Sequence, residues 1–260
     1  MTLHRYTIFC FDEISFPWLT YTETNKFWIK RQICKWMEST YDDVKDPEVR
    51  KRLIPTYEIG CKRITPHPNY AKTFNKPNVR LVTNRIEEIT KGGISTEHGK
   101  HHDLDTIIYA TGFDIVKSVN SFKMTGAGGM SYADVTGDAP AAMNGVVVPN
   151  FPNFFILNGP NTALGHNSVI FMIECQSIYI TSCIRRLIEA EGKSIDCRPV
   201  SMSKWLNYIY AELNKKVWTS GCTSYHRNEK GVVHTIWPNN AVEYWWRLLQ
   251  CDMADFKLRD

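Results

Sequence analysis

The stretch NFFILNGPNTALGHNSVIFMIE, residues 153–174, decides the fold class because it passes from an apolar run through a turn into a helical pattern. Residues 153–157 read as a short buried strand, and the Asn-Gly-Pro-Asn of residues 158–161 is a strong turn signal. From Val169 onward, apolar residues recur with helical spacing, and Gly192 lies where a C-cap is expected. A strand, a turn and a helix in this order predict an α/β fold.

The turn that precedes this helix is a candidate binding site. The first residues of a helix carry N–H groups without an intrahelical partner and lie at the positive end of the helix dipole. Such a site suits a phosphate, a carboxylate or the carbonyl edge of a flavin. An ordinary capped helix is the alternative, and these residues alone leave the choice open.

A second buried strand is predicted from the β-branched run of residues 104–110, which leads into Thr111 and Gly112. Because glycine has no Cβ, the backbone at Gly112 can approach a flat ligand closely. Shorter strands, separated by glycine-containing turns, are expected before this run: residues 79–83, 86–90 and 94–96.

Helical spacing of apolar residues predicts helices within residues 1–55 and from Lys204 to about Lys216. Farther on, two short apolar runs flank a glycine-containing loop and predict a hairpin over residues 223–237. Residues 114–150 are rich in glycine and alanine and read as a long loop. Within that loop, GAGGMS (126–131) has the glycines of a dinucleotide-binding loop, but no helix is expected after it, so a flexible loop is predicted.

The composition describes an ordinary globular protein and excludes several classes. Of 260 residues, 22% are charged and 43% hydrophobic, and the formal net charge of +4 is too small to indicate a nucleic-acid partner. Residues 139–173 carry no charged side chain, but prolines and asparagines interrupt them, so no membrane span is expected. The eight cysteines form no CxxC pair and no secretory signal is evident, so we expect a cytoplasmic chain with reduced cysteines.

Two groups of residues are candidate metal sites. Cys222, His226 and His234 have ligand-like spacing, but a structural zinc site needs four ligands. Histidines also gather at residues 98–102, around a polar turn. We expect neither group to bind a metal.

Lys62 and Arg63 follow Gly60-Cys61 and form an adjacent pair of cations. Such a pair is often only a surface feature. It also suits a site that binds a phosphate and needs a separate fixed positive charge. The pair alone does not choose between these interpretations.

Several of these segments occur together in one order. Gly60-Cys61-Lys62-Arg63 comes first, the Ala-Thr-Gly-Phe of residues 110–113 second, GPNTALGHNSVIFMIE (159–174) third, and Trp237-Pro238 last. In this order they resemble the C-terminal half of flavin-dependent Baeyer–Villiger monooxygenases, within the flavin-containing monooxygenase superfamily. The resemblance covers about residues 50–250.

The resemblance implies a fold and its division. The fold would be a partial α/β flavoprotein with two Rossmann-like dinucleotide-binding domains and a helical insertion. Residues 1–57 would be the helical insertion of the NADP-binding domain, residues 58–113 the C-terminal part of that domain, and residues 114–260 the C-terminal part of the FAD-binding domain.

The resemblance also implies a chemistry that uses FAD, NADPH and O2. A flavin peroxide would insert one oxygen atom into a ketone or oxygenate a soft heteroatom. By position, Arg63 resembles the catalytic arginine and Lys62 the lysine that meets the 2′-phosphate of NADPH. The further cofactor-binding residues implied are Thr111, Gly112, Asn158, Thr162, Leu164, Gly165, His166 and Asn167. Trp237, Met172 and the loop 114–140 are candidates for substrate contact.

The chain also departs from the family pattern. Both GxGxxG loops are missing, and so are the F-x-G-x-x-x-H-x-x-x-W-P linker and the acidic partner of the arginine. We therefore expect a fragment that is weak or inert alone, with strands that lack sheet neighbours and a missing N-terminal half as its partner. The alternative is a catalytically inactive truncated relative that acts as a binding or interaction protein.

Overall fold

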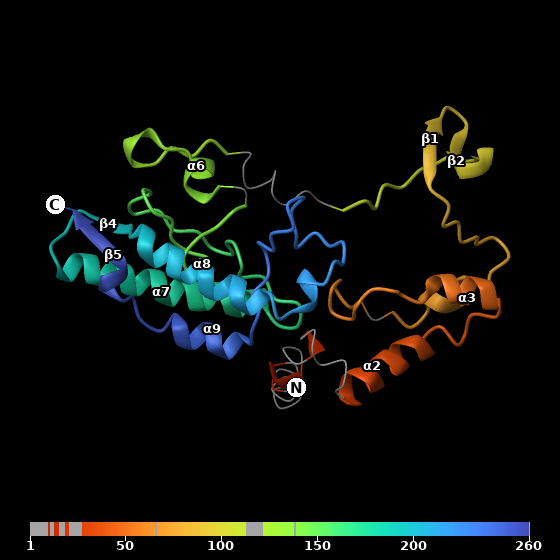
Figure 1. Cartoon of the computed structure of the whole chain (residues 1–260), viewed down its shortest axis with the longest axis horizontal. Coiled ribbons are helices and arrows are strands. Elements are labelled where there is room, and N and C mark those ends of the chain that lie inside the picture. The colour runs from red at the N-terminus through yellow and green to blue at the C-terminus, as the bar shows by residue number, and fades with distance from the viewer. Residues whose placement is uncertain are drawn as a thin grey trace. The chain divides into compact units, whose positions relative to one another are not determined.

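The computed structural model describes residues 10, 13–15, 19–20, 28–65, 67–112, 122–137 and 139–259. They form a mixture of helices and strands (Figure 1). The chain divides into two compact units, which are described separately. The first comprises residues 1–30, 57–64 and 114–260, and the second comprises residues 31–56 and 65–113.

The first unit is built around α7 (Val169–Glu189), α8 (Pro199–Leu213) and α9 (Ala241–Arg247). β4 (Ser194–Cys197) pairs antiparallel with β5 (Phe256–Arg259) to form a two-stranded sheet. The unit also contains a short helix, α6 (Tyr132–Thr136), and 3-10 turns at Ala127–Gly129, Val217–Thr219 and Met253–Asp255.

The predicted helix after the 158–161 turn is confirmed as α7. Ser168 is its N-cap, and the Ser168 side chain accepts a hydrogen bond from the Phe171 N–H. The helix stops because Glu191 adopts a φ of 53° and the Gly192 N–H turns back to the Leu187 carbonyl at 3.2 Å. Its buried face recurs with helical spacing and consists of Met172, Cys175, Gln176, Tyr179 and Cys183.

The core of the first unit lies between these helices and the loops that follow them. Trp218, Trp237, Tyr179 and Tyr244 are its largest fully buried apolar side chains. Trp237 stacks on Trp205 of α8 with ring centroids 5.9 Å apart. The second predicted helix is confirmed as α8, but it begins at Pro199, five positions before Lys204. Proline is well suited to a first helical position because its missing N–H would have no partner there.

The second unit contains three antiparallel strands in the order β1-β2-β3: Ile86–Thr90, Gly93–Thr96 and Lys100–Asp103. The strands predicted at residues 86–90 and 94–96 are thereby confirmed, whereas residues 79–83 form no strand. The helical spacing within residues 1–55 is confirmed by α2 (Trp28–Ser39), which begins in the first unit. A further helix, α3 (Pro47–Leu53), lies in a charged stretch that was expected to be a connector. The second unit also contains α4 (Tyr70–Thr73) and a single 3-10 turn (Glu97–Gly99).

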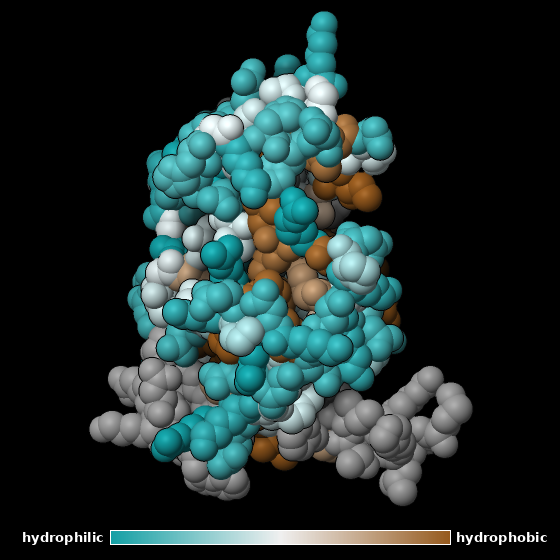
Figure 2. Space-filling model, turned by 90° about the vertical axis from the view of Figure 1, so that its right-hand side faces the viewer, coloured by the Kyte–Doolittle hydropathy of each residue, from teal (hydrophilic) through white to brown (hydrophobic). Residues whose placement is uncertain are grey.

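Two predicted strands are wrong. Residues 104–110 and 153–157 belong to no strand, and the apolar side chains of Ile108, Tyr109 and Leu157 are 86%, 68% and 50% exposed. A strand needs a neighbour to satisfy its backbone groups, and neither run has one within the described ranges. Figure 2 shows, in brown, hydrophobic residues that reach the surface among hydrophilic ones on one face of the molecule.

Two loop predictions also need correction. A short helix, α6, follows residues 126–131, where none was expected, because Ser131 and Asp134 form a reciprocal capping box. The hairpin predicted over residues 223–237 is reduced to a turn with one bridge, between Arg227 and Val233. In the part of the chain that is described, no helix has both the length and the apolar character needed to cross a bilayer.

Candidate functional site

The loop of residues 158–167, called here the 158–167 loop, leads into α7 and is tightly folded. Asn158 and Asn161 both have positive φ, 54° and 58°. A Cβ added at Gly159 would lie 2.2 Å from the Gly145 carbonyl oxygen, so only glycine fits there. Thr162 is fully buried, and its hydroxyl donates to the Gly159 carbonyl at 2.6 Å. The loop therefore has one defined conformation within this chain.

The segment of residues 233–237 braces the 158–167 loop. The Asn161 and Ala163 N–H groups donate to the carbonyls of His234 and Thr235, both at 2.9 Å. The Trp237 N–H donates back to the Ala163 carbonyl at 2.8 Å. The Asn161 side chain donates to two more carbonyls of the same segment, at 3.1 and 3.3 Å. This pairing holds the middle of the loop from one side.

Gln176 of α7 braces the start of the loop. It is fully buried, and its Oε1 accepts the Asn158 N–H at 2.8 Å. Its Nε2 donates to the Tyr244 hydroxyl at 3.0 Å, and that hydroxyl donates to the Asn144 carbonyl at 2.7 Å. Burial raises the pKa of Tyr244 well above its ordinary value, so the hydroxyl keeps its proton.

Glu13 braces the end of the loop. Its buried carboxylate contacts the side chains of His166 and Asn167 and the first N–H groups of α9. Sequence reasoning missed both Glu13 and Gln176. A polar residue among the apolar positions of α7 was a signal for Gln176, whereas nothing local singles out Glu13.

The residues predicted to bind the flavin differ in accessibility. Asn158 is exposed, while Thr162 and Leu164 are buried within the loop packing. Partly accessible are Gly165, His166 and Asn167. The accessible residues therefore lie at the two ends of the loop, although the His166 side chain itself is only 3% exposed, and Thr162 and Leu164 are buried between them.

Lys62 and Arg63 lie at the surface of the first unit, directly after a buried anchor. Cys61 is fully buried and forms a disulfide with Cys222. Lys62 lies over the Tyr57 ring, 4.7 Å from its centroid. Arg63 is exposed and makes no hydrogen bond or ion pair with any described residue. The disulfide corrects the expectation that all cysteines are reduced.

The same C-terminal segment therefore carries both motifs. Residues 217–222 hold the stretch before the cationic pair through the disulfide between Cys222 and Cys61. Residues 233–237 hold the 158–167 loop. The first unit thus brings the cationic pair and the candidate flavin loop onto one scaffold.

Thr111 and Gly112 belong to the second unit and are exposed. Gly112 has a φ of 92°, and no atom lies within 4 Å of a Cβ added there. The backbone at Gly112 is therefore open on the side where a Cβ would lie.

The two side chains named for substrate contact lie in the core. Met172 is 0% and Trp237 is 1% exposed, and the Trp237 ring N–H donates to the Asn240 carbonyl at 2.8 Å. Neither side chain reaches solvent, which corrects their assignment as substrate-contacting candidates. Of the loop 114–140, residues 114–121 and 138 lie outside the described residues.

The groups weighed as metal sites have other partners. Cys222 is in the disulfide, and His226 Nδ1 lies 2.6 Å from the Thr235 hydroxyl. Burial, assisted by the nearby His234, lowers the pKa of His226 to about 4. His101 Nδ1 lies 3.1 Å from the Ser95 hydroxyl. No group of three metal-ligating side chains occurs among the residues that the structure describes.

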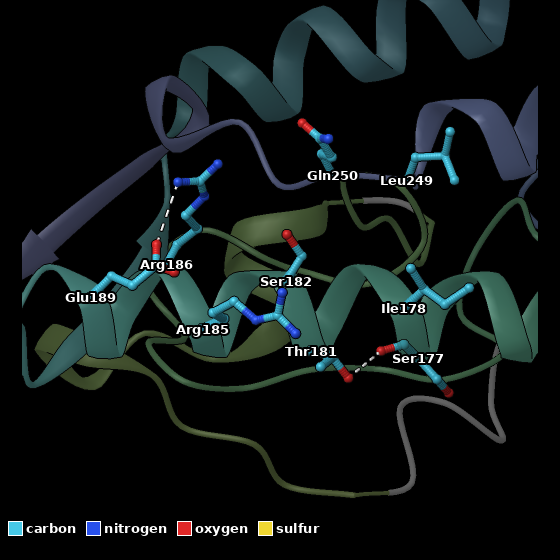
Figure 3. Close-up of a pocket in the computed structure, with 9 residues that line it drawn as sticks. All are labelled: Ser177, Ile178, Thr181, Ser182, Arg185, Arg186, Glu189, Leu249 and Gln250. Atoms are coloured by element: carbon cyan, nitrogen blue, oxygen red, sulfur yellow. Dashed lines mark hydrogen bonds and ion pairs between the residues drawn. The ribbon is translucent and has the colours of Figure 1, made fainter.

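A surface cavity of about 530 Å³ lies along α7 (Figure 3). Arg186 at its wall pairs with Glu189 at 3.4 Å. The lining residues are Ser177, Ile178, Thr181, Ser182, Arg185, Arg186, Glu189, Leu249 and Gln250. None of them is a predicted site residue, so this cavity is separate from the candidate site.

The chain is similar to monooxygenases, although no protein-family model matches it. It is 32% identical over 217 residues to a Baeyer–Villiger monooxygenase of Streptomyces coelicolor, covering 83% of this chain and 42% of that protein. It is 35% identical over 230 residues to the FAD-binding monooxygenase ktnD of Aspergillus niger, covering 86% of this chain and 37% of that protein. The chain therefore spans about two fifths of the length of these relatives.

A solved structure agrees with the sequence comparisons. The OTEMO complex with FAD and NADP matches with a TM-score of 0.78 and 27% identity. The match covers 91% of this chain and 44% of that chain. The fold is thus that of part of a larger protein, as the motifs predicted.

Proposed function

We propose that this chain supplies the C-terminal part of an FAD- and NADPH-dependent oxygenase, because it is similar over 83% and 86% of its length to about two fifths of two such monooxygenases. The reaction adds one oxygen atom from O2 to a ketone or to a soft heteroatom. The observation that carries the proposal is that residues 217–237 of one unit lie against both motifs: the Cα atoms of Cys61 and Cys222 are 6.4 Å apart, and residues 233–237 hydrogen-bond to the 158–167 loop.

The residues present fit the two cofactors. FAD, reduced by NADPH, supplies the oxygen-transferring chemistry when it is bound. The exposed Asn158 and the accessible end of the 158–167 loop would hold its ring, with Thr162 and Leu164 keeping the loop in shape. The exposed backbone turn at Thr111-Gly112 suits close approach of a flat group.

Lys62 and Arg63 have different tasks in this proposal. The lysine ammonium is a mobile point charge that suits the 2′-phosphate of NADPH. The guanidinium of Arg63 keeps its charge at every physiological pH and has no competing partner among the described residues. Arg63 therefore stabilises negative charge that develops during oxygen transfer, which is electrostatic catalysis by a fixed cation.

The exposed apolar runs support a second polypeptide part. Ile108 and Tyr109 follow the pattern of a buried strand but are 86% and 68% exposed here. Their pairing partners are proposed to lie in the N-terminal part of the monooxygenase, which also carries the glycine-rich loops for both pyrophosphates. With that part, the chain completes the two Rossmann-like domains and the helical insertion, divided at residues 57 and 113 as the resemblance implies.

The same proposal includes a cytoplasmic location, where NADPH is held reduced. The Cys61–Cys222 disulfide is uncommon in that compartment. Alkylation of thiols in freshly lysed cells, followed by mass spectrometry, measures how much of this pair is oxidised there. A fully oxidised pair would contradict the cytoplasmic location.

The proposed function is tested by assembly. The chain is co-expressed with the N-terminal part of the Streptomyces coelicolor relative, and this pair is called the two-part assembly below. We expect it to retain FAD, seen by its visible absorption, and to oxidise NADPH with formation of an ester or lactone from a cyclic ketone. The chain expressed alone is the control.

Two results contradict the proposal. An assembly that forms but retains no flavin excludes the cofactor site. An assembly that retains flavin but makes no oxygenated product from a panel of ketones and sulfides favours the alternative function, an inactive relative that only binds a partner.

A further inference from the structure

Glu13 is a buried acid held at the meeting point of three distant segments. Its side chain is only 7% exposed, and acidic side chains are almost never buried unless they are paired. Oε1 accepts a hydrogen bond from Asn167 Nδ2 at 2.6 Å and lies 3.3 Å from His166 Nε2. Oε2 accepts the N–H groups of Ala241 and Val242 at 2.6 and 3.2 Å.

Each oxygen of this carboxylate therefore serves a different element. Oε1 holds the end of the 158–167 loop, and Oε2 holds the start of α9, whose own N-cap is Asn240. The side chain that makes these contacts lies 154 and 228 positions earlier in the sequence. One charged group thus fixes the loop relative to the helix.

The carboxylate is well suited to this task because it is ionised. Burial alone raises the pKa of Glu13. The hydrogen bonds from His166, Asn167 and Val242, together with the charge of His166, outweigh burial and leave the pKa below its ordinary value. Hydrogen bonds to an ionised acceptor are about twice as strong as neutral ones.

We propose that Glu13 is a positioning residue for flavin binding: its carboxylate clamps His166 and Asn167 to α9 and so fixes the part of the 158–167 loop that meets the cofactor. The clamp is a property of this chain alone. Its role toward the flavin rests on the proposed function.

The clamp is tested first on the 260-residue chain without cofactor. Glu13→Gln keeps the shape of the side chain but removes its charge and one acceptor. We expect hydrogen exchange at residues 161–168 and at Ala241 and Val242 to become about 10-fold faster, as loss of charge-assisted hydrogen bonds implies. Glu189→Gln, an exposed change on α7, is the matched control and leaves exchange at these positions unchanged. Unchanged exchange in Glu13→Gln would overturn the proposal.

A second variant covers the case in which Glu13→Gln does not fold. Asn167→Ala removes the donor to Oε1, together with the Oδ1 that accepts the Ser168 N–H, but leaves the contacts of Oε2 intact. We expect the loop to exchange faster while Ala241 and Val242 remain protected. If exchange rises equally in the loop and at the start of α9, or rises in neither, the two oxygens of Glu13 do not hold separate elements and the proposal is overturned.

The role toward flavin is tested in the two-part assembly. Glu13→Gln should raise the dissociation constant for FAD about 10-fold and shift the visible absorption of the bound flavin. The Michaelis constant for NADPH should stay unchanged. A loosened loop with an unaltered flavin spectrum and affinity would leave Glu13 a purely structural clamp and overturn its positioning role.

The assembly also separates this inference from the function on which it rests. A wild-type assembly without flavin overturns the proposed function and, with it, the role of Glu13 toward the cofactor. The exchange measurements on the chain alone still decide whether the clamp exists.

Discussion

The two units of this chain differ in how they bury apolar side chains. The first unit has a continuous core that includes Trp218, Trp237 and Tyr244. In the second unit, Val44 and Ala71 are the only buried hydrophobic side chains among the described residues. Large apolar side chains of the second unit, such as Ile108, face solvent. The first unit has the features of a self-sufficient fold, and the second has local structure without a core.

We attribute the difference to contacts that the apolar residues of the second unit would make with a part of the protein outside this chain. The second unit keeps its three-stranded meander and a capped helix, which depend on nearby residues. Its strand-like run at residues 104–110 depends on neighbours that the described chain does not provide. Since the chain spans 42% and 37% of two relatives, the remainder of such proteins is the source of neighbours that we propose.

The largest expected effect separates the two units directly. Trp218→Ala removes a side chain that is 1% exposed in the core of the first unit, and should cost about 3–5 kcal/mol of unfolding free energy. Ile108→Ala should cost less than about 0.5 kcal/mol in the chain alone. Urea unfolding followed by circular dichroism measures both. A cost above about 1 kcal/mol for Ile108→Ala would reveal packing in the second unit and break the comparison.

Arg63 sharpens the comparison because it is exposed although its unit is well packed. Arg63→Ala should leave stability unchanged but lower oxygenation by the two-part assembly about 10²–10³-fold, while NADPH still reduces the flavin. Stopped-flow absorption separates flavin reduction from product formation. Arg185→Ala, an exposed change on α7, is the matched control. An equal loss of both half-reactions would contradict a role in oxygen transfer.

The sequence predicted what depends on neighbouring residues. α7, its preceding turn and the strands at residues 86–90 and 94–96 follow from local spacing and turn residues, and all are confirmed. The strand predicted over residues 153–157 is wrong. An apolar pattern indicates that residues are buried, but it does not show that a partner strand is available. The Asn153 N–H donates to the Ile195 carbonyl of β4 and the Ile156 N–H to the Val146 carbonyl, and these hydrogen bonds do not continue into a strand pairing.

The candidate site divides in the same way. The Lys62-Arg63 pair and the 158–167 loop could be named from motifs, because each motif is continuous in sequence. The contacts of Glu13 and the Cys61–Cys222 disulfide could not be predicted. Asn167 lies 154 positions after Glu13, and Cys222 lies 161 positions after Cys61. Contacts at such separations leave no periodic signal in one sequence.

A pH dependence confined to the first unit tests the comparison next. His226 is buried and its pKa is lowered to about 4, against about 6.5 in an unfolded chain. Between these values the unfolded chain binds more protons, so stability is lost as pH falls from 6.5 to 4, by roughly 3 kcal/mol. Hydrogen exchange should show this loss in the first unit only. His226→Gln should remove most of this dependence of stability on pH, whereas His101→Gln in the second unit should leave it unchanged.

Lys62 should have a smaller effect, seen only in the two-part assembly. Lys62→Ala removes a charged partner of the 2′-phosphate and should raise the Michaelis constant for NADPH about 10-fold, with little change in turnover. The preference for NADPH over NADH should narrow accordingly. Lys72→Ala, which removes an exposed lysine of the second unit, is the control. Identical kinetics with both nucleotides before and after Lys62→Ala would contradict the assignment.

The smallest effect tests whether the second unit is held by local structure. The Asp46 side chain caps α3 by accepting the N–H groups of Glu48 and Val49 at 2.9 and 3.2 Å. Asp46→Ala should cost about 1 kcal/mol, and exchange within α3 should rise about 5-fold while the first unit is unaffected. Asp46→Ser keeps a capping oxygen and should restore protection. If exchange in α7 rises by the same factor, the two units unfold together. The second unit would then not unfold separately, although few of its described apolar side chains are buried.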